Sequence, residues 1–299
     1  MSFMTDVYVV PSRVLGVYRY VLHSSSKGVG RSELEEMLSP VAILGIDSSQ
    51  TDSDDEEKLK RARAMTAQTI NECVKAKLLT EKGGRLRLSA ALPKELKDKK
   101  CGERLLPLAL TDLLFSDRKR SANHDLGCAI AWFLSLDIYS APITADTLEP
   151  RQWEHVQSFG LNPTRFDMLG YWACYMGYAW MQTSGRSRAF VPDPTTHVRS
   201  RMMQILGTAP KREASLPSVM KQLADRSPVF EGGYLRDEVA SVMGQSDDKH
   251  LSSSTSAALL RLRDEGSLEL AMKSDAERMM VHDGTTYVPY STIVWRGGV

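Results

Sequence analysis

Apolar residues recur at the spacing of an α-helix in three stretches of the N-terminal third. The first stretch, 11–22, opens with proline and serine, which favour a helix start. The second, 31–38, has Ser32 as a candidate N-cap, and the third is a basic, amphipathic segment that begins at Glu56. The residues that share the apolar faces of the first and third helices are Val14, Val17, Tyr18, Val21 and Leu22, and Leu59, Ala62, Thr66, Ile70 and Cys73.

Residues 78–88 change the period, because apolar and basic residues alternate there about Gly83 and Gly84. Glycine accepts the positive φ that a tight hairpin turn needs. The alternation directs Arg85 and Arg87 outward while the leucines beside them face inward. Three helices followed by a basic hairpin form the order of a winged helix-turn-helix.

An insertion weakens the match to that module. Residues 41–46 are apolar and predict a short strand, whereas 47–57 are rich in serine and acid and predict a solvated loop. The usual turn of the module is much tighter. An alternative reading of the acids is that they favour the positive end of the helix that follows.

The middle of the chain predicts further helices. Residues 92–100 are charged and show no core face, so we place a domain boundary near them. A stripe as aromatic as that of 164–181 is expected in a core or between domains, with base stacking on nucleic acid as the lesser alternative. The predicted elements are helices at 105–115 and 126–136, a basic turn at 116–120, a short helix with Trp153 and His155, a long helix at 164–181, a basic turn entering a strand at 185–191, and a helix at 195–206.

The C-terminal third repeats the order of the first. Gly266 stands where a left-handed residue ends a helix. The predicted elements are helices with faces at 216–223, 234–243 and 250–265, and strands at 268–272, 278–282 and 285–289 with a turn at Asp283 and Gly284.

These elements predict a mainly α fold with small β-hairpin wings, in which tandem winged helix-turn-helix domains flank a helical middle domain. The expected domains are 1–91, 101–209 and 213–299. The middle domain is also compatible with a degenerate winged helix.

Composition narrows the class of protein. Hydrophobic residues make up 42% and charged residues 25%, as in ordinary globular proteins. No apolar run approaches the length that a bilayer requires, and the first ten residues lack a secretory pattern, so we expect a cytoplasmic protein without a membrane partner. The formal net charge of +1 gives no global attraction to nucleic acid, so any such binding must come from local patches.

Candidate enzyme chemistry is sparse. The cysteines (Cys73, Cys101, Cys128 and Cys174) are widely separated, so we expect no metal site and no cofactor. The His-Asp pairs at 124–125 and 282–283 are isolated and fit turns or structural roles, and no phosphate-binding glycine loop is present. We therefore expect no enzyme and no small-molecule substrate, unless residues distant in sequence converge.

Three basic regions are the candidate DNA contacts. A helix in the major groove reads bases, and a wing reaches the adjacent phosphates. The competing reading is a solvated helix face, which is what charge runs usually are. The candidate DNA-binding residues are Lys58, Lys60, Arg61, Arg63 and Gln68 on the helix, Lys82, Arg85 and Arg87 on the wing, and Arg186 and Arg188 in the middle region.

The C-terminal module offers weaker candidates. The serines of 252–256 can bind phosphates together with Arg261 and Arg263, but they serve equally well as a helix N-cap, the reading we prefer. Asp275 and Glu277 make the following loop unlike a cationic tip. The pattern therefore favours protein contact for this module.

Three short segments carry a family resemblance. The end modules resemble bacterial winged helix proteins over about half of the chain. The segments 10–20, 169–173 and 190–194 are similar to the DpdG component of bacterial islands that place 7-deazaguanine derivatives in DNA and restrict unmodified DNA. That resemblance implies a non-catalytic accessory in defence against phage, working with helicase or nuclease partners. It transfers no catalytic residue.

The sequence thus predicts a subunit that binds or senses double-stranded DNA among other protein subunits. The first alternative is an interaction scaffold whose winged helices pack on proteins and never touch DNA. The second is a transcriptional regulator, which requires a dimer, although no long apolar heptad repeat indicates a dimer interface.

Overall fold

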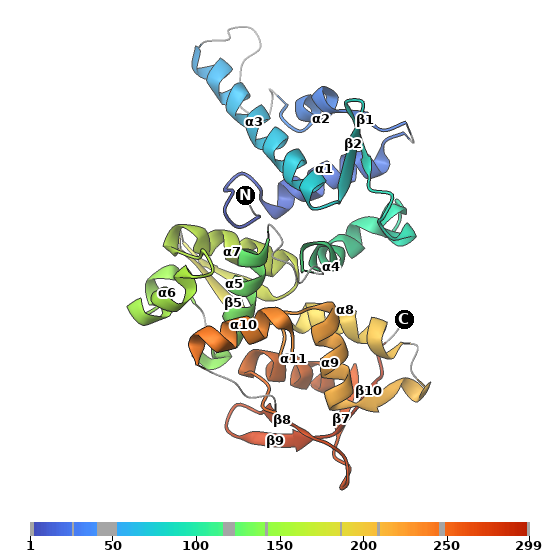
Figure 1. Cartoon of the computed structure of the whole chain (residues 1–299), viewed down its shortest axis with the longest axis vertical. Coiled ribbons are helices and arrows are strands. Elements are labelled where there is room, and N and C mark those ends of the chain that lie inside the picture. The colour runs from blue at the N-terminus through green and yellow to red at the C-terminus, as the bar shows by residue number, and fades with distance from the viewer. Residues whose placement is uncertain are drawn as a thin grey trace. The chain divides into compact units, whose positions relative to one another are not determined.

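The computed structural model describes residues 3–25, 27–40, 53–115, 123–140, 143–185, 187–207, 210–244 and 249–297. The chain divides into two compact units, Met1–Leu113 and Leu114–Val299, which we call unit 1 and unit 2. Both are mainly helical with small antiparallel sheets, as Figure 1 shows. The general class of fold is therefore confirmed, while the three predicted domains stay a prediction.

Unit 1 is built from a helical layer and a three-stranded sheet. The sheet has the order β1-β3-β2, and Lys82 pairs with Arg85 across the two-residue turn. Gly83 and Gly84 have φ of 60° and 68°, as expected for this turn. Its elements are α1 (Pro11–His23), β1 (Val29–Gly30), α2 (Arg31–Met37), α3 (Ser53–Lys75), β2 (Leu79–Lys82), β3 (Arg85–Leu88), the 3-10 helix η2 (Lys94–Lys97) and α4 (Gly102–Phe115), which ends in unit 2.

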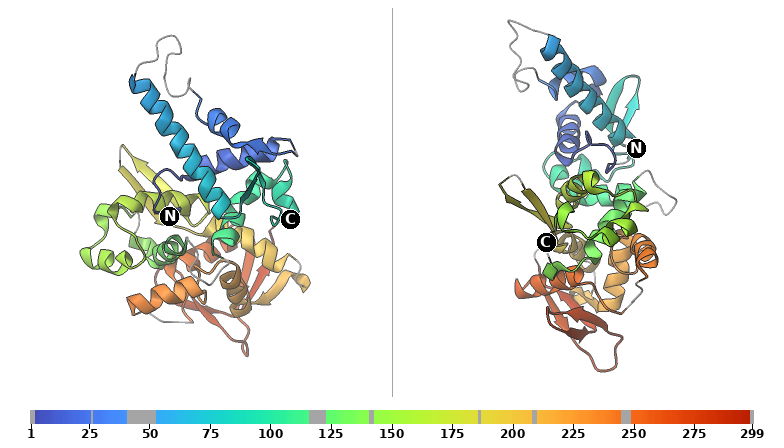
Figure 2. Two further views of the ribbon diagram at one scale, coloured as in Figure 1. Left: turned by 45° about the horizontal axis from the view of Figure 1, so that its top comes forward. Right: turned by 90° about the vertical axis from the view of Figure 1, so that its left-hand side faces the viewer.

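The core of unit 1 joins α1 to the second half of α3 and to the hairpin. Val17, Tyr18, Ile70 and Leu86 are almost fully buried there. By contrast, no side chain from 54 to 65 is buried. The first turns of α3 extend away from α1 and α2 in Figures 1 and 2.

Local expectations fail at three places in unit 1. Residues 53–57 are helical rather than looped, because Asp54, Asp55 and Glu56 lie in the first turn, where the helix dipole favours acids. The predicted strand 41–46 lies outside the described residues. Residues 92–100 do have a core face: Leu92 and Leu96 are buried, and the Tyr18 hydroxyl donates to the Leu96 carbonyl. The N-cap of α2 is Gly30 rather than Ser32.

The first half of unit 2 contains a second helical layer and a two-stranded hairpin. Its elements are α5 (His124–Ser135), the 3-10 helices η3 (Ile138–Ser140) and η4 (Ala145–Thr147), α6 (Pro150–Gln157), α7 (Pro163–Tyr175), β4 (Ala179–Ser184), β5 (Ser187–Pro192) and α8 (Thr195–Leu206). The long helix expected to reach Met181 ends at Tyr175, since Gly177 takes a φ of 80° and the chain turns into β4. Trp172 and Tyr178 of its aromatic stripe are buried in the core, as expected, whereas Tyr171 and Tyr175 are half-buried and Trp180 is 46% exposed. The predicted turn 116–120 lies outside the described residues.

The second half of unit 2 follows the predicted order of helices and adds strands. Its elements are η5 (Pro210–Arg212), β6 (Glu213–Ser215), α9 (Leu216–Arg226), α10 (Tyr234–Met243), α11 (Ser253–Asp264), β7 (Leu268–Ala271), β8 (Met279–His282), β9 (Tyr287–Tyr290) and β10 (Thr292–Trp295). The hairpin β8-β9 turns at Asp283 and Gly284 as predicted. The strands β6 and β10, which the pattern did not indicate, form a sheet of order β6-β10-β7.

One strand-pairing topology occurs three times. In unit 1, a short strand, two helices and a hairpin follow one another, and the first strand pairs with the last. In the first half of unit 2, Ile143 precedes α6, α7, β4 and β5, and it bridges to Phe190 of β5. In the second half of unit 2, β6 precedes α9, α10 and α11, and β6 pairs with β10. Compared with the other two sets, this one contains an additional helix, α10, and the additional hairpin β8-β9. One helix precedes each set: α1 the first, α5 the second and α8 the third.

A buried histidine joins α8 to the chain before α10. The two ring nitrogens of His197 lie 3.0 Å from the Met176 carbonyl and 2.8 Å from the Ser227 hydroxyl. The guanidinium of Arg201 donates to the same hydroxyl at 3.0 Å. Burial and the charge of Arg201 lower the pKa of His197 to about 3. The folded chain therefore holds a neutral imidazole.

Helical glycines provide a first test of the packing. A Cβ at Gly170 on α7 would lie 2.2 Å from the Phe190 ring, whereas a Cβ at Gly16 on α1 would lie 3.7 Å from its nearest neighbour, Leu38. We expect Gly170→Ala to lower the free energy of unfolding by about 1–3 kcal/mol because the ring must shift. Gly16→Ala should raise it by about 0.5–1 kcal/mol. Thermal unfolding of both variants measures the difference, and equal effects would contradict the packing.

The pH dependence of stability tests the neutral His197. The unfolded chain binds a proton here below about pH 6.5, and the folded chain does so only near pH 3. Stability is therefore fully present above pH 6.5 and is lost as the pH falls through this window, by up to about 1.4 kcal/mol per pH unit. His197→Gln should reduce that slope in urea unfolding from pH 7 to pH 5. An unchanged slope would exclude this contribution.

Candidate nucleic-acid interface

The exposed first half of α3 carries the predicted helix cations. Lys60, Arg61 and Arg63 are exposed and make no ion pair or hydrogen bond with the residues that the structure describes. Lys58 is exposed too, but its ammonium group lies 2.9 Å from the Asp55 carboxylate. Gln68 is half-buried. Three of the five predicted side chains are thus available to an external anion.

The hairpin carries the second group of cations, of which Arg85 and Arg87 are hydrogen-bonded within unit 1. Lys82 is exposed beside the turn, and within the described part of the chain it has no partner. Arg85 donates to the Gly28 carbonyl at 3.0 Å, and Arg87 donates twice to the Lys27 carbonyl at 2.9 and 3.2 Å. Both guanidinium groups are exposed and keep further N–H donors. They brace the loop before β1 while presenting charge to solvent.

Arg31 is the residue that the pattern missed. Its guanidinium contacts Glu35 and Glu81 at 3.0 Å each, the Ala67 carbonyl at 3.2 Å and the Asn71 side chain at 2.6 Å. These partners lie on α2, α3 and β2, so one side chain fixes the helix and the hairpin to each other. The only sequence signal was a basic residue at the start of a short acidic helix.

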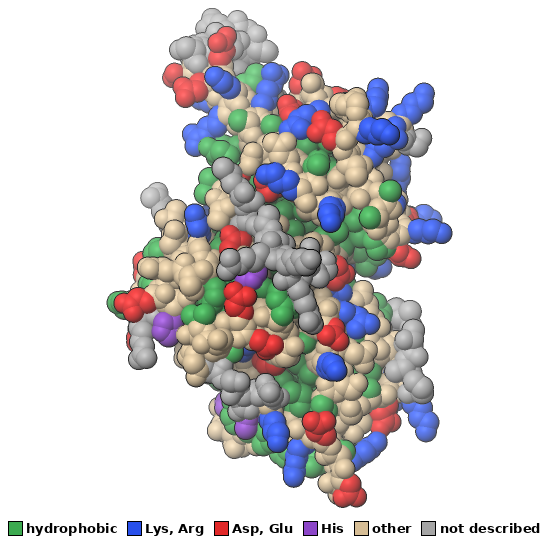
Figure 3. Space-filling model, viewed as in Figure 1, with side chains coloured by type: hydrophobic (Ala, Val, Ile, Leu, Met, Phe, Trp, Pro, Cys, Tyr) green, Lys and Arg blue, Asp and Glu red, His purple; other side chains and the backbone are tan. Residues whose placement is uncertain are grey.

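The surface around these cations is mixed in sign. Figure 3 shows Lys and Arg side chains beside Asp and Glu over the part of the chain drawn as α2, α3 and the hairpin in Figure 1. The acids Asp54, Glu56 and Glu57 on the first turns of α3 are exposed. Because the first turns of α3 are acidic, we expect an anion to contact α3 beyond them, at Lys60, Arg61 and Arg63.

The predicted cations of the middle hairpin belong to unit 2. Arg188 is exposed, but it donates to the Tyr171 hydroxyl, lies 5.5 Å from that ring and is 3.9 Å from the Asp167 carboxylate. Arg186 lies outside the described residues. The geometry thus gives Arg188 a local role on α7.

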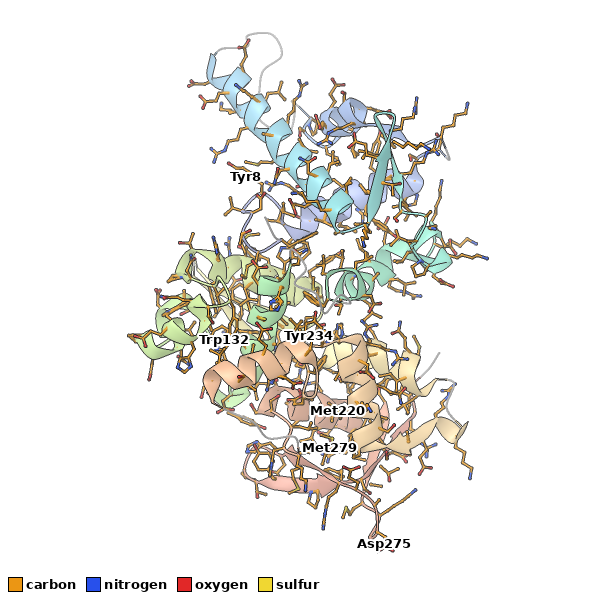
Figure 4. All side chains as sticks on the ribbon, in the orientation of Figure 1. Tyr8, Trp132, Met220, Tyr234, Asp275 and Met279 are labelled. Carbon is orange, nitrogen blue, oxygen red and sulfur yellow. The ribbon has the colours of Figure 1, made fainter. Side chains whose placement is uncertain are left out.

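The C-terminal candidates are engaged within unit 2. Ser252 caps α11, as preferred, by accepting from the Thr255 amide, and Ser254, Thr255 and Ser256 are buried. Arg261 pairs with Asp193, and Arg263 with Asp264. Asp275 lies at the outer end of the β7-β8 connection in Figure 4. This module therefore presents no cationic cluster comparable with that of unit 1 among its described residues.

These features define a mainly helical protein with small antiparallel sheets and a local cationic surface on unit 1. A family model described as DpdG-like matches residues 1–276 of the chain. The chain therefore belongs to the DpdG-like family, which confirms the resemblance read from the three short segments. Membership implies a part in the multi-component Dpd modification system, beside other proteins.

No curated protein and no solved structure matches the chain. Within the described residues, none of the helices has both the length and the apolar character needed to cross a bilayer.

Arg31 supplies the test of how the surface is held together. Arg31→Ala removes four partners of a side chain that is 28% exposed, so we expect the free energy of unfolding to fall by about 1–2 kcal/mol. The control is Arg19→Ala, whose side chain is 56% exposed and pairs with Glu103, and it should cost less than about 1 kcal/mol. Urea unfolding of both variants measures the difference, and a loss at Arg31 no larger than at Arg19 would refute the bracing role.

Proposed function

We propose that the chain is a non-catalytic subunit of the Dpd system that binds double-stranded DNA, and that unit 1 is a winged helix that makes the contact. In this proposal α3 approaches the major groove and the β2-β3 hairpin follows the adjacent phosphates. The observation that carries it is the group of exposed cations on α3 and at the hairpin turn that have no partner in the described part of the chain.

The topology of unit 1 supports the winged helix. A helix, a short strand, two helices and a hairpin follow in order, and β1 pairs with β3 at the open edge of the hairpin. This arrangement places the hairpin turn and the exposed face of α3 on elements that Arg31 ties together. A rigid pair of helix and wing can reach two neighbouring features of a duplex at once.

The charges support phosphate contact rather than base reading. Lys60, Arg61, Arg63 and Lys82 have no competing carboxylate among the described residues, so phosphate would replace only water around them. Each cation that meets a phosphate releases a condensed counterion. Affinity should consequently depend on salt even though the net charge of the whole chain is only +1.

Salt dependence of duplex binding is the direct test. Each phosphate contact contributes ~0.9 to the slope of log affinity against log salt. In filter-binding titrations, the triple variant Lys60→Ala/Arg61→Ala/Arg63→Ala removes up to three such contacts, so we expect weaker binding and a slope reduced by about 2–3. The control Lys94→Ala/Lys99→Ala/Lys100→Ala removes the same number of positive charges from a different place, η2 and the residues that follow it. That control should retain the slope of the wild type.

Two results would contradict the proposal. One is a triple variant that binds with the affinity and slope of the wild-type chain, and the other is a control variant that loses as much as the triple variant. Circular dichroism of each variant shows whether the fold is kept, and all six substituted side chains are exposed, so little change is expected.

A second candidate function is an interaction scaffold, and one observation favours it. Trp180 and Met181 on β4 are 46% and 42% exposed, which places two large apolar side chains at solvent on the middle hairpin. A scaffold of this kind would hold other Dpd subunits without touching DNA. It predicts that the wild-type chain binds no duplex at any salt concentration in the same titration.

A further inference from the structure

Three potential metal ligands from two helices of unit 2 meet outside the proposed DNA surface. His124 and Cys128 lie on α5, and Glu238 lies on α10. The Cys128 sulfur is 3.3 Å from Nδ1 of His124, and Nε2 of the same ring is 2.9 Å from the Glu238 carboxylate. One ligand atom from each side chain lies within 4.8 Å of the others.

The helices explain why these residues meet. His124 and Cys128 are four positions apart, so they stand above one another on one face of α5. The packing of α10 on α5 brings Glu238 to that face from a distant part of the sequence. In Figure 4, the labelled side chains Trp132 and Tyr234 mark these helices, Trp132 two turns after His124 and Tyr234 one turn before Glu238.

Burial gives the cluster an inner and an outer side. Cys128 has no exposed surface, the His124 side chain is 18% exposed and the Glu238 side chain is 43% exposed. An ion can therefore enter at the carboxylate and reach the sulfur past the imidazole. The α5 residues from Leu126 to Leu134 are all buried, so the Cys128 end of the cluster lies in the interior of unit 2.

We propose that His124, Cys128 and Glu238 bind one zinc ion. Thiolate, imidazole and carboxylate are each common zinc ligands, and three of them leave a fourth position for water or another group. Ligand atoms around tetrahedral zinc are about 3.3–3.8 Å apart, given bonds of about 2.0–2.3 Å. The three ligand atoms now lie within 4.8 Å of one another, so side-chain rotations that move them by about 1 Å would give that spacing. The ion would then join α5 to α10.

The competing arrangement is a metal-free chain of hydrogen bonds. In it the Cys128 thiol donates to Nδ1 of His124, and Nε2 donates to Glu238. All three polar groups are then satisfied, so the two arrangements differ in a measurable quantity, the affinity of the metal-free chain for zinc.

Zinc and cobalt titrations of the full chain decide between them. We expect the metal-stripped wild type to compete with a chromophoric chelator for one equivalent of Zn²⁺. With Co²⁺ it should give the absorption of a tetrahedral, thiolate-bound ion. Glu238→Gln should weaken Zn²⁺ binding at least tenfold while preserving the fold, because this side chain is partly exposed. Cys128→Ser should abolish the thiolate-to-cobalt absorption.

Cys174→Ser is the matched control, because that cysteine lies on α7 and is not one of the cluster. It should leave both signals unchanged. A wild-type chain that takes up no equivalent of Zn²⁺ would overturn the proposal, as would a Cys128→Ser variant that keeps the cobalt absorption. These results are independent of DNA binding, since none of the substituted residues lies on unit 1.

Discussion

The proposed interface depends on one packing interaction, the burial of the second half of α3 against α1 and the hairpin. Ile70 and Cys73 of α3 have no exposed surface, and Leu79 and Leu86 fill the same core from the strands. Because a helix has fixed periodicity, burying this stripe sets the direction of every other side chain on α3. Lys60 and Arg61 are thereby turned to solvent, with no ion pair or hydrogen bond to any residue that the structure describes.

Arg31 adds a polar constraint to that packing. Apolar contacts fix the distance between α3 and the hairpin, but they are poorly directional. A guanidinium with partners on α2, α3 and β2 specifies the angle between these elements as well. The same side chain also neutralises Glu35 and Glu81, and Glu81 directly precedes the exposed Lys82 on β2.

The elements that depend on local pattern were the ones that the sequence predicted well. The ranges of α1, α8 and α10 and the Gly83-Gly84 turn follow from spacing and residue type alone. Features set by distant partners were missed. The strands β6 and β10 exist because they pair with each other, Leu96 is buried because it packs in unit 1, and Arg31 has partners up to fifty positions away. For the same reason the sequence did not group Glu238 with His124 and Cys128, since Glu238 reaches His124 only through the fold.

The threefold topology separates what the fold provides from what the charges provide. The sets place two helices (three in the last set) between a first strand and its partner, yet only in unit 1 are several described cations on the last of these helices left without partners among the described residues. In the last set, Arg261 and Arg263 lie in the last turn of α11, and Asp193 and Asp264 occupy their donors. A cation already paired gains little from phosphate, because it must give up one anion to bind another. The same scaffold can therefore serve DNA contact in unit 1 and internal packing in unit 2, and the difference lies in the acids placed beside each arginine.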